Sequence, residues 1–172
     1  ARDSNTTAEM EALSEESLNA LSEAMECAPA RGDLLLQRGK VRHLLGHEAK
    51  ETMADFTKAT EVEPDLPEAW LALGSVQQQS QSLYTAAIFS FSQAIELEPT
   101  MGLAWLQRSR LLWKRSDSNG ALADAERAVE FMPGSIPARL MRARVLRQLD
   151  YLIRAEGDAT WAIDQDDQNA SA

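Results

Sequence analysis

Apolar residues recur at helical spacing along most of the chain, in paired segments that short polar turns separate. The clearest pair lies in 102–133, where apolar positions three and four residues apart form one face of each of two helices, about 102–115 and 118–131. No competing stretch shows the strict alternation that is typical of a β-strand. The pattern therefore predicts an all-α chain built from helical hairpins.

Small residues in these hairpins return at an almost constant interval. The four residues Ser109, Ala121, Ala125 and Ala128 are each followed, 34 residues later, by an alanine, namely Ala143, Ala155, Ala159 and Ala162. In the other direction, Trp105 has a counterpart 35 residues earlier in Trp70, and Pro133 has one 34 residues earlier in Pro99. Such a period indicates stacked repeats, each burying its apolar face against the next.

We therefore divide the chain into a leading segment, four repeats and a tail. The segment 1–30 is predicted to be an acidic N-terminal capping helix or a degenerate repeat, because end repeats need a polar outer face. The repeat region, 31–168, holds repeats at about 33–66, 67–101, 102–135 and 136–168, and the tail is 169–172. The predicted helix pairs are 33–45 with 48–62, 67–80 with 82–97, 102–115 with 118–131, and 136–149 with 151–166. Pro64, Pro99 and Pro133 each follow the second helix of a pair, since proline cannot continue a helix.

These repeats resemble the tetratricopeptide repeat (TPR), a 34-residue helix–turn–helix unit. The small residue of the first helix is matched by Gly39, Gly74, Ser109 and Ala143, and the late alanine of the second helix by Ala59, Ala94, Ala128 and Ala162. Small side chains allow two antiparallel helices to cross closely. The resemblance implies a right-handed α-solenoid, a superhelix of stacked antiparallel helix pairs whose first helices line a concave face.

The fourth repeat departs from the pattern. It has Arg139 where the second and third repeats have tryptophan, and Asp167 in place of the proline. Trp161 stands where the other repeats have polar residues, so we expect it to contact a further C-terminal helix, a second copy of the chain, or nothing. The divergence suggests a piece of a larger protein or an end that a partner covers.

Two charged positions vary together among the repeats. Arginine occurs directly before the small residue of the first helix in three repeats, and aspartate occurs at one position of the second helix in the same three. The second repeat has Leu73 and Ser90 instead. We therefore predict three structural ion pairs, Arg38 with Asp55, Arg108 with Asp124, and Arg142 with Asp158.

The resemblance also implies where a ligand binds, since such solenoids use their concave surface. Residues three and four apart on each first helix share one face. The predicted peptide-binding residues are Leu36, Lys40 and His43, then Leu71, Ser75 and Gln78, then Leu106, Arg110 and Trp113, and finally Leu140, Arg144 and Arg147.

Charge supports this assignment. The chain has a formal net charge of -10, yet the first helices of the third and fourth repeats carry eight Lys and Arg residues and no acid. A basic strip with apolar neighbours suits a partner peptide that has an acidic segment and hydrophobic anchors. The alternative is that these arginines only solvate the helices and cover apolar surface with their stems.

Several function classes are disfavoured. The negative charge argues against nucleic-acid binding, and no apolar run approaches the ~20 residues that membrane insertion needs. No phosphate loop or catalytic constellation appears, so we expect no enzyme activity and no cofactor. We expect no metal site at His43 and His47 either, because Gly46 should end the helix between them. These features favour a cytoplasmic protein.

The chain is thus predicted to be a non-catalytic protein–protein interaction scaffold. Two alternatives stay open: a structural or assembly module that self-associates through its C-terminal end, and a co-chaperone-type regulatory module of a larger protein. The family's two-carboxylate clamp for chaperone tails needs Lys and Asn at set positions of the first helices. Those positions here include Leu36, Ala72 and Gln107, which disfavours a chaperone-tail adaptor.

Overall fold

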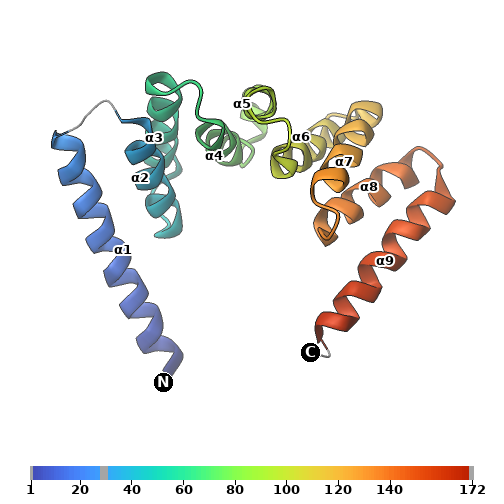
Figure 1. Cartoon of the computed structure of the whole chain (residues 1–172), viewed down its shortest axis with the longest axis horizontal. Helices are drawn as coiled ribbons and strands as arrows, with labels where there is room; N and C mark the ends of the chain where they lie inside the picture. Colours follow the sequence, from blue (N-terminus) through green and yellow to red (C-terminus); the bar gives the residue numbers. More distant parts are fainter. Residues whose placement is uncertain (1, 28–30, 171–172) are drawn as a thin grey trace. The chain divides into compact units, whose positions relative to one another are not determined.

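The computed structural model describes the backbone of residues 2–27 and 31–170, and the side chains of 12–24, 26 and 31–165. Within these ranges the chain is helical and contains no strand (Figure 1). The helices are α1 (Arg2–Cys27), α2 (Gly32–Leu44), α3 (Ala49–Val62), α4 (Pro67–Gln77), the short 3-10 helix η1 (Gln81–Leu83), α5 (Tyr84–Leu97), α6 (Gly102–Lys114), α7 (Ser118–Phe131), α8 (Ile136–Gln148) and α9 (Leu152–Ala170).

The chain forms two compact units, Ala1–Leu83 and Tyr84–Ala172. The first unit holds α1 to α4 with η1, and the second holds α5 to α9. The predicted second repeat is therefore shared between them, with α4 in one unit and α5 in the other. Each unit is a separate body in the description that follows.

Consecutive helices pack as hairpins within each unit. In the N-terminal unit, α2 pairs with α3, and α4 packs against both. In the C-terminal unit, α6 pairs with α7 and α8 with α9, while α8 also packs against α7 and α6 (Figure 1). This stacking of one hairpin on the next is the arrangement predicted from the repeat, and the helix boundaries agree within a few residues. The largest differences are in the fourth repeat, where α9 continues to Ala170, beyond the predicted end at 166 and into the predicted tail, and in the second repeat, where α4 ends at Gln77 and η1 occupies part of the turn.

The turn between the two helices of a repeat uses a left-handed residue in three repeats. These residues are Gly46, Ser116 and Asp150, with φ of 72°, 64° and 61°. In each case the next backbone N–H reaches back to a carbonyl five residues earlier, for example Asp117 N to Leu112 O at 3.0 Å. This closure satisfies the last carbonyls of the first helix. Only glycine adopts such a φ without steric cost, so the other two turns are strained.

A second recurring bond ties the start of the first helix to the segment before it in the second, third and fourth repeats. The indole Nε1 of Trp70 donates to the carbonyl of Pro64, and that of Trp105 donates to the carbonyl of Pro99, both at 2.8 Å. In the fourth repeat Arg139 takes over, since its Nε donates to the carbonyl of Pro133 at 3.3 Å. The arginine that departs from the sequence pattern therefore makes the same contact as the tryptophans.

Small residues lie where helices cross. The N-terminal core packs Leu35 and Phe56 around Gly39, where an added Cβ would overlap the Phe56 ring. In the third repeat the corresponding pair is Ser109 and Ala125, both fully buried. A larger side chain on the first helix, Ser109 in place of Gly39, is thus matched by a smaller one on the second helix, Ala125 in place of Phe56.

The three predicted ion pairs are present. Both oxygens of each aspartate accept from one arginine, at 3.0 and 2.5 Å for Arg38 with Asp55, 2.7 and 2.9 Å for Arg108 with Asp124, and 2.7 and 2.6 Å for Arg142 with Asp158. The aspartates are buried and the arginines are half-buried. Each pair links the first helix of a repeat to the second, which makes it part of the scaffold rather than of a ligand surface.

Candidate peptide-binding surface

Four side chains of α6 and α8 form one patch on the C-terminal unit, which we call the cationic strip: Arg110, Trp113, Arg144 and Arg147. The guanidinium of Arg144 lies over the Trp113 ring, 5.3 Å from its centroid. Partial burial, and then the nearby charge of Arg144, lower the pKa of Arg110 from its ordinary value. Positive charges from neighbouring repeats are therefore held close together, around an aromatic ring.

No acid neutralises this strip. Within the described part of the chain, Arg110, Arg144 and Arg147 form no ion pair, and Arg110 donates only to the amide oxygen of Gln107, at 3.1 Å. Arg108 and Arg142 lie on the same two helices, but they form ion pairs with Asp124 and Asp158. The strip thus keeps three uncompensated positive charges in a protein of net charge -10.

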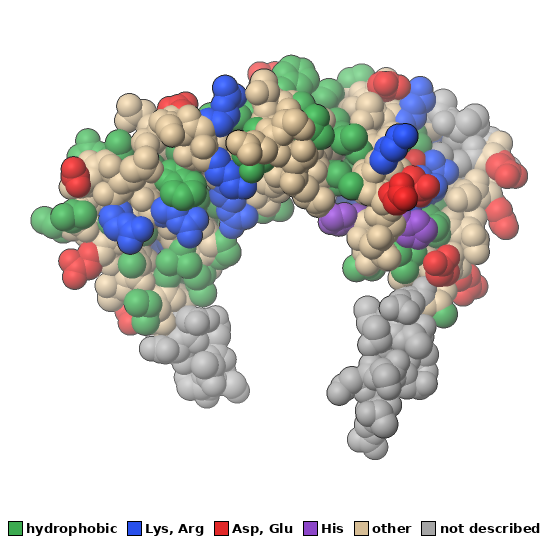
Figure 2. Space-filling model, turned by 180° about the vertical axis from the view of Figure 1, so that it is seen from behind, with side chains coloured by type: hydrophobic (Ala, Val, Ile, Leu, Met, Phe, Trp, Pro, Cys, Tyr) green, Lys and Arg blue, Asp and Glu red, His purple; other side chains and the backbone are tan. Residues whose placement is uncertain are grey.

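Apolar groups border these charges. Trp113 is half-buried, and its indole Nε1 is buried without an acceptor among the described residues. Leu140, on α8, is exposed. Figure 2 shows Lys and Arg side chains among hydrophobic ones on the visible face of the C-terminal unit. Such a surface can hold a carboxylate and an apolar side chain side by side.

The other predicted binding residues differ in accessibility. Leu36 and Leu106 are each only 3% exposed and belong to the cores of their units, so they support the surface from beneath and do not face solvent. Lys40 and His43 are exposed on α2. The remaining three, Leu71, Ser75 and Gln78, are half-buried on α4 or at its end, and the Ser75 hydroxyl is occupied by the carbonyl of Leu71 at 2.8 Å.

These residues divide between the two units. The structure brings together Arg110, Trp113 and Arg144 in the C-terminal unit, while Leu36, Lys40, His43, Leu71, Ser75 and Gln78 belong to the N-terminal unit. A single groove that runs through all four repeats therefore stays a prediction.

Known structures share this architecture, although sequence comparisons find no relative. A scan against protein-family models gives no match, and a search of curated proteins gives none either. Among solved structures, a crystal structure of MamA is 19% identical with a TM-score of 0.79, covering 90% of each chain. The TPR protein YrrB, described as having an unusual peptide-binding site, is 20% identical with a TM-score of 0.73, covering 93% of this chain and 81% of its own. The chain has a tetratricopeptide-repeat fold.

A third TPR structure is the first TPR of Spaghetti (RPAP3) bound to an HSP90 peptide, SRMEEVD. It is 18% identical with a TM-score of 0.65, and the match covers 70% of this chain and 94% of that one. At these identities the likeness is one of fold. The TPR architecture explains why the small residues recur at one period, because the two helices of every repeat cross closely at the same positions.

Trp161 has a contact that the sequence analysis missed. The Arg139 guanidinium lies over its ring, 3.9 Å from the centroid, so Trp161 has a partner within its own repeat. The signal was present in the TPR alignment: the third repeat has Trp105 and Arg127 at the two positions where the fourth has Arg139 and Trp161. Trp105 and Arg127 line one surface pocket together. The two residue types have exchanged places.

The two histidines lie on opposite sides of Gly46. His43 lies on α2, whereas His47 lies beyond Gly46, with its Nδ1 3.8 Å from Glu51 Oε2. Over the described residues, no group of three or more potential His, Cys, Asp or Glu ligands comes together. The Cys27 side chain lies outside those residues. The described helices also include none that is long and apolar enough to cross a bilayer.

Proposed function

We propose that this TPR-fold chain is a non-catalytic interaction scaffold that binds an acidic, partly hydrophobic segment of a partner protein on the cationic strip. The observation that carries the proposal is a set of three guanidinium groups on α6 and α8 that have no acidic partner among the described residues. Arg144 lies over Trp113 and close to Arg110, and it lines a pocket with Arg147 and the exposed Leu140. Two solved TPR structures whose descriptions name a peptide or a peptide-binding site support it.

The chemistry of the strip favours carboxylates over other anions of a protein. Guanidinium groups bind carboxylates through two parallel hydrogen bonds, and arginine is weakly hydrated, so it gives up water at low cost. An apolar residue of the ligand can pack against Leu140 and the Trp113 ring. Because the rest of the protein is acidic, an acidic ligand should be directed to this patch and repelled elsewhere.

The N-terminal unit extends this proposal. Lys40 and His43 are exposed on α2, at positions that correspond to Arg110 and Trp113. If the first helices of all four repeats face one groove, as the TPR resemblance implies, these side chains contact the same ligand further along its length. We expect this binding to take place in the cytoplasm.

The test is a titration with a labelled peptide that has two leucines among glutamates, compared with a copy in which glutamines replace the glutamates. Only the acidic peptide should bind, and affinity should fall as salt rises, because exposed charge pairs are screened. The double variant Arg144→Glu/Arg147→Glu should weaken binding by about tenfold or more.

The matched control is Arg127→Glu/Arg154→Glu, which makes the same change in net charge on the second helices α7 and α9. Both arginines are exposed and pair with surface glutamates, so the fold should tolerate their replacement. Equal loss of affinity in the two double variants would mean that only overall charge matters, and the cationic strip would not be the binding site.

A further inference from the structure

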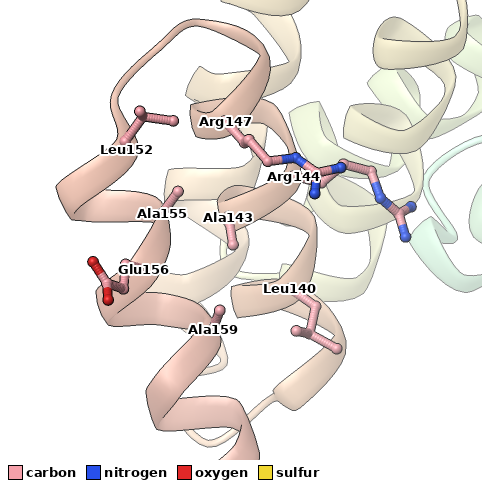
Figure 3. A pocket seen from close by; sticks show the side chains of 8 residues that line it. All are labelled: Leu140, Ala143, Arg144, Arg147, Leu152, Ala155, Glu156 and Ala159. Carbon is pink, nitrogen blue, oxygen red and sulfur yellow. The ribbon is translucent and has the colours of Figure 1, made fainter.

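A groove lies between α8 and α9 at the end of the C-terminal unit, and we call it the end groove. Its apolar floor is formed by Leu140, Ala143, Leu152, Ala155 and Ala159, and it encloses about 520 Å³. Figure 3 shows the small side chains of the floor between the two helices, with Arg144 and Arg147 reaching from α8 away from α9. Glu156 lies on the opposite side.

The protein contains a filled version of the same groove one repeat earlier. Between α6 and α7, the residues Leu106, Ala121 and Ala125 correspond to Leu140, Ala155 and Ala159. There they form one core cluster with Ala138, Met141 and Val145 of α8. Helix α8 therefore fills the groove between α6 and α7, which we call the filled groove. Its sequence and contacts show what kind of helix such a groove accepts.

The exposed fractions of equivalent side chains show that the end groove is less covered than the filled groove. Leu106 is 3% exposed in the filled groove, whereas Leu140 is 44% exposed in the end groove. Val129 is 7% exposed, whereas its counterpart Ile163 is 61% exposed. The apolar surface at Leu140 and Ile163 is exposed to water, and a helix docked in the groove would bury it, which favours docking.

The filled groove also gives the register of an occupant. Helix α8 contributes Ala138, Met141 and Val145 to the cluster, and Leu149, just after the helix, packs against it. If Ala138 is position 1, the apolar residues stand at positions 1, 4, 8 and 12, which lie on one face of a helix. A small residue opens this face and larger ones follow it.

Charge specifies one further position. In the filled groove, position 7 is Arg144, which lies over Trp113 and close enough to Arg110 to lower its pKa. One repeat later, the counterparts of Arg110 and Trp113 are Arg144 and Arg147. A residue at position 7 of a docked helix would therefore meet two guanidinium groups, and a carboxylate suits that place.

We propose that the end groove docks an amphipathic helix from a partner protein, with apolar residues at positions 1, 4, 8 and 12 and an acid at position 7. This docking is separate from the binding of a peptide on the cationic strip. The two binding surfaces share Arg144, Arg147 and the neighbouring Leu140, but Ala159 belongs only to the groove and Arg110 only to the strip.

The α8 sequence itself supplies the probe, as a labelled peptide of residues 135–149. Arg139 and Arg142 are replaced by alanine in it, because their partner is Asp158 of the same repeat. One peptide keeps arginine at position 144 and the other has glutamate there. Measured by fluorescence anisotropy, the glutamate peptide should bind the chain about fivefold more tightly than the arginine peptide. The chain variant Arg147→Glu should remove most of this difference, because one of the two positive charges that face position 7 becomes negative.

Two controls separate the groove from the strip. Ala159→Arg fills the groove and should abolish binding of both peptides, whereas Arg110→Gln should change the affinity less than twofold. Circular dichroism and thermal unfolding check that Ala159→Arg folds. If it does not, the smaller difference between the two peptides in Arg147→Glu still tests the proposal.

Three results would overturn the proposal: no saturable binding of either peptide, equal affinities that Arg147→Glu leaves unchanged, or a stronger effect of Arg110→Gln than of Ala159→Arg. Sedimentation of the chain alone tests the competing occupant. If the chain self-associates and Ala159→Arg makes it monomeric, a second copy fills the groove and the assignment to a partner helix is wrong.

Discussion

The contribution of the ion pair between Arg108 and Asp124 to stability can be tested with substitutions taken from another repeat of the same protein. The second repeat has leucine and serine at these two positions, and both Leu73 and Ser90 are buried there. The double variant Arg108→Leu/Asp124→Ser therefore copies a combination that this fold already uses. Each single variant removes one partner and leaves the other.

The structure sets the size of the effect. Two charge-assisted hydrogen bonds of 2.7 and 2.9 Å join the side chains, and Asp124 is 5% exposed while Arg108 is 20% exposed. Removing one member of a buried pair costs ~3–5 kcal/mol, because the other charge stays buried without compensation. Since Arg108 reaches solvent and also donates to Ser92 at 2.9 Å, we take the low end, about 3 kcal/mol, for each single variant.

The double variant should cost less than the sum of the singles. Replacing a buried ion pair by uncharged residues is often nearly neutral, but the lost contacts of Arg108 with Ser92 and with the Trp105 ring remain lost. We expect about 3 kcal/mol for the double variant, which gives a coupling of about 3 kcal/mol between the two side chains.

Urea unfolding followed by far-UV circular dichroism measures all four proteins of this cycle. Stacked repeats need not unfold in one step, so the slope of each transition must be compared before free energies are subtracted. Amide hydrogen exchange in α6 and α7 provides a local measure when the slopes differ. The exposed pair of Lys58 and Glu61 is the control, and breaking it should have no measurable effect. Strictly additive costs, or a loss below about 1 kcal/mol for Asp124→Ser, would refute the reasoning.

Two further predictions concern the backbone and the helix crossing. Ser116→Gly should raise the free energy of unfolding by about 0.5–1 kcal/mol, because glycine removes the steric cost of a φ of 64°, and Gly46→Ala should lower it by a similar amount. Urea titration of both variants checks the opposite signs, and two shifts of the same sign would contradict the argument. Gly39→Ala should destabilise the protein by about 1–3 kcal/mol, because the new methyl group overlaps the Phe56 ring. Thermal unfolding measures this, and restoration of stability by a second change of Phe56 to leucine would identify the overlap as the cause.

The sequence predicted the helices and their pairing well, since both depend on local periodicity and on small residues that recur. The ion pairs could also be predicted from the sequence, because the second repeat lacks both the Arg and the Asp, as expected for two residues that contact each other. Spacing alone could not separate exposed from buried residues on the first helices. Leu106 and Arg110 are four residues apart on one face, yet Leu106 points into the core while Arg110 reaches the surface.

Other features depend on packing between repeats, which a single helix pattern does not contain. The end groove was not predicted, because its recognition requires the contacts of α8 in the filled groove. Nothing in the composition of the turns distinguished the left-handed Ser116 from its neighbours. The division between Leu83 and Tyr84 was not predicted either, since the repeat pattern continues across it.

The exchanged tryptophan and arginine of the last two repeats bear on how such proteins can be recombined. Because Arg139 and Trp161 contact each other within one hairpin, either order of the two residues is acceptable as long as both helices come from the same repeat. A chimera that joined α6 to α9 would bring Trp105 opposite Trp161, and one that joined α8 to α7 would set Arg139 against Arg127. The piece of this protein that evolution or an engineer can move is therefore the complete hairpin, and crossovers inside the turns should be selected against.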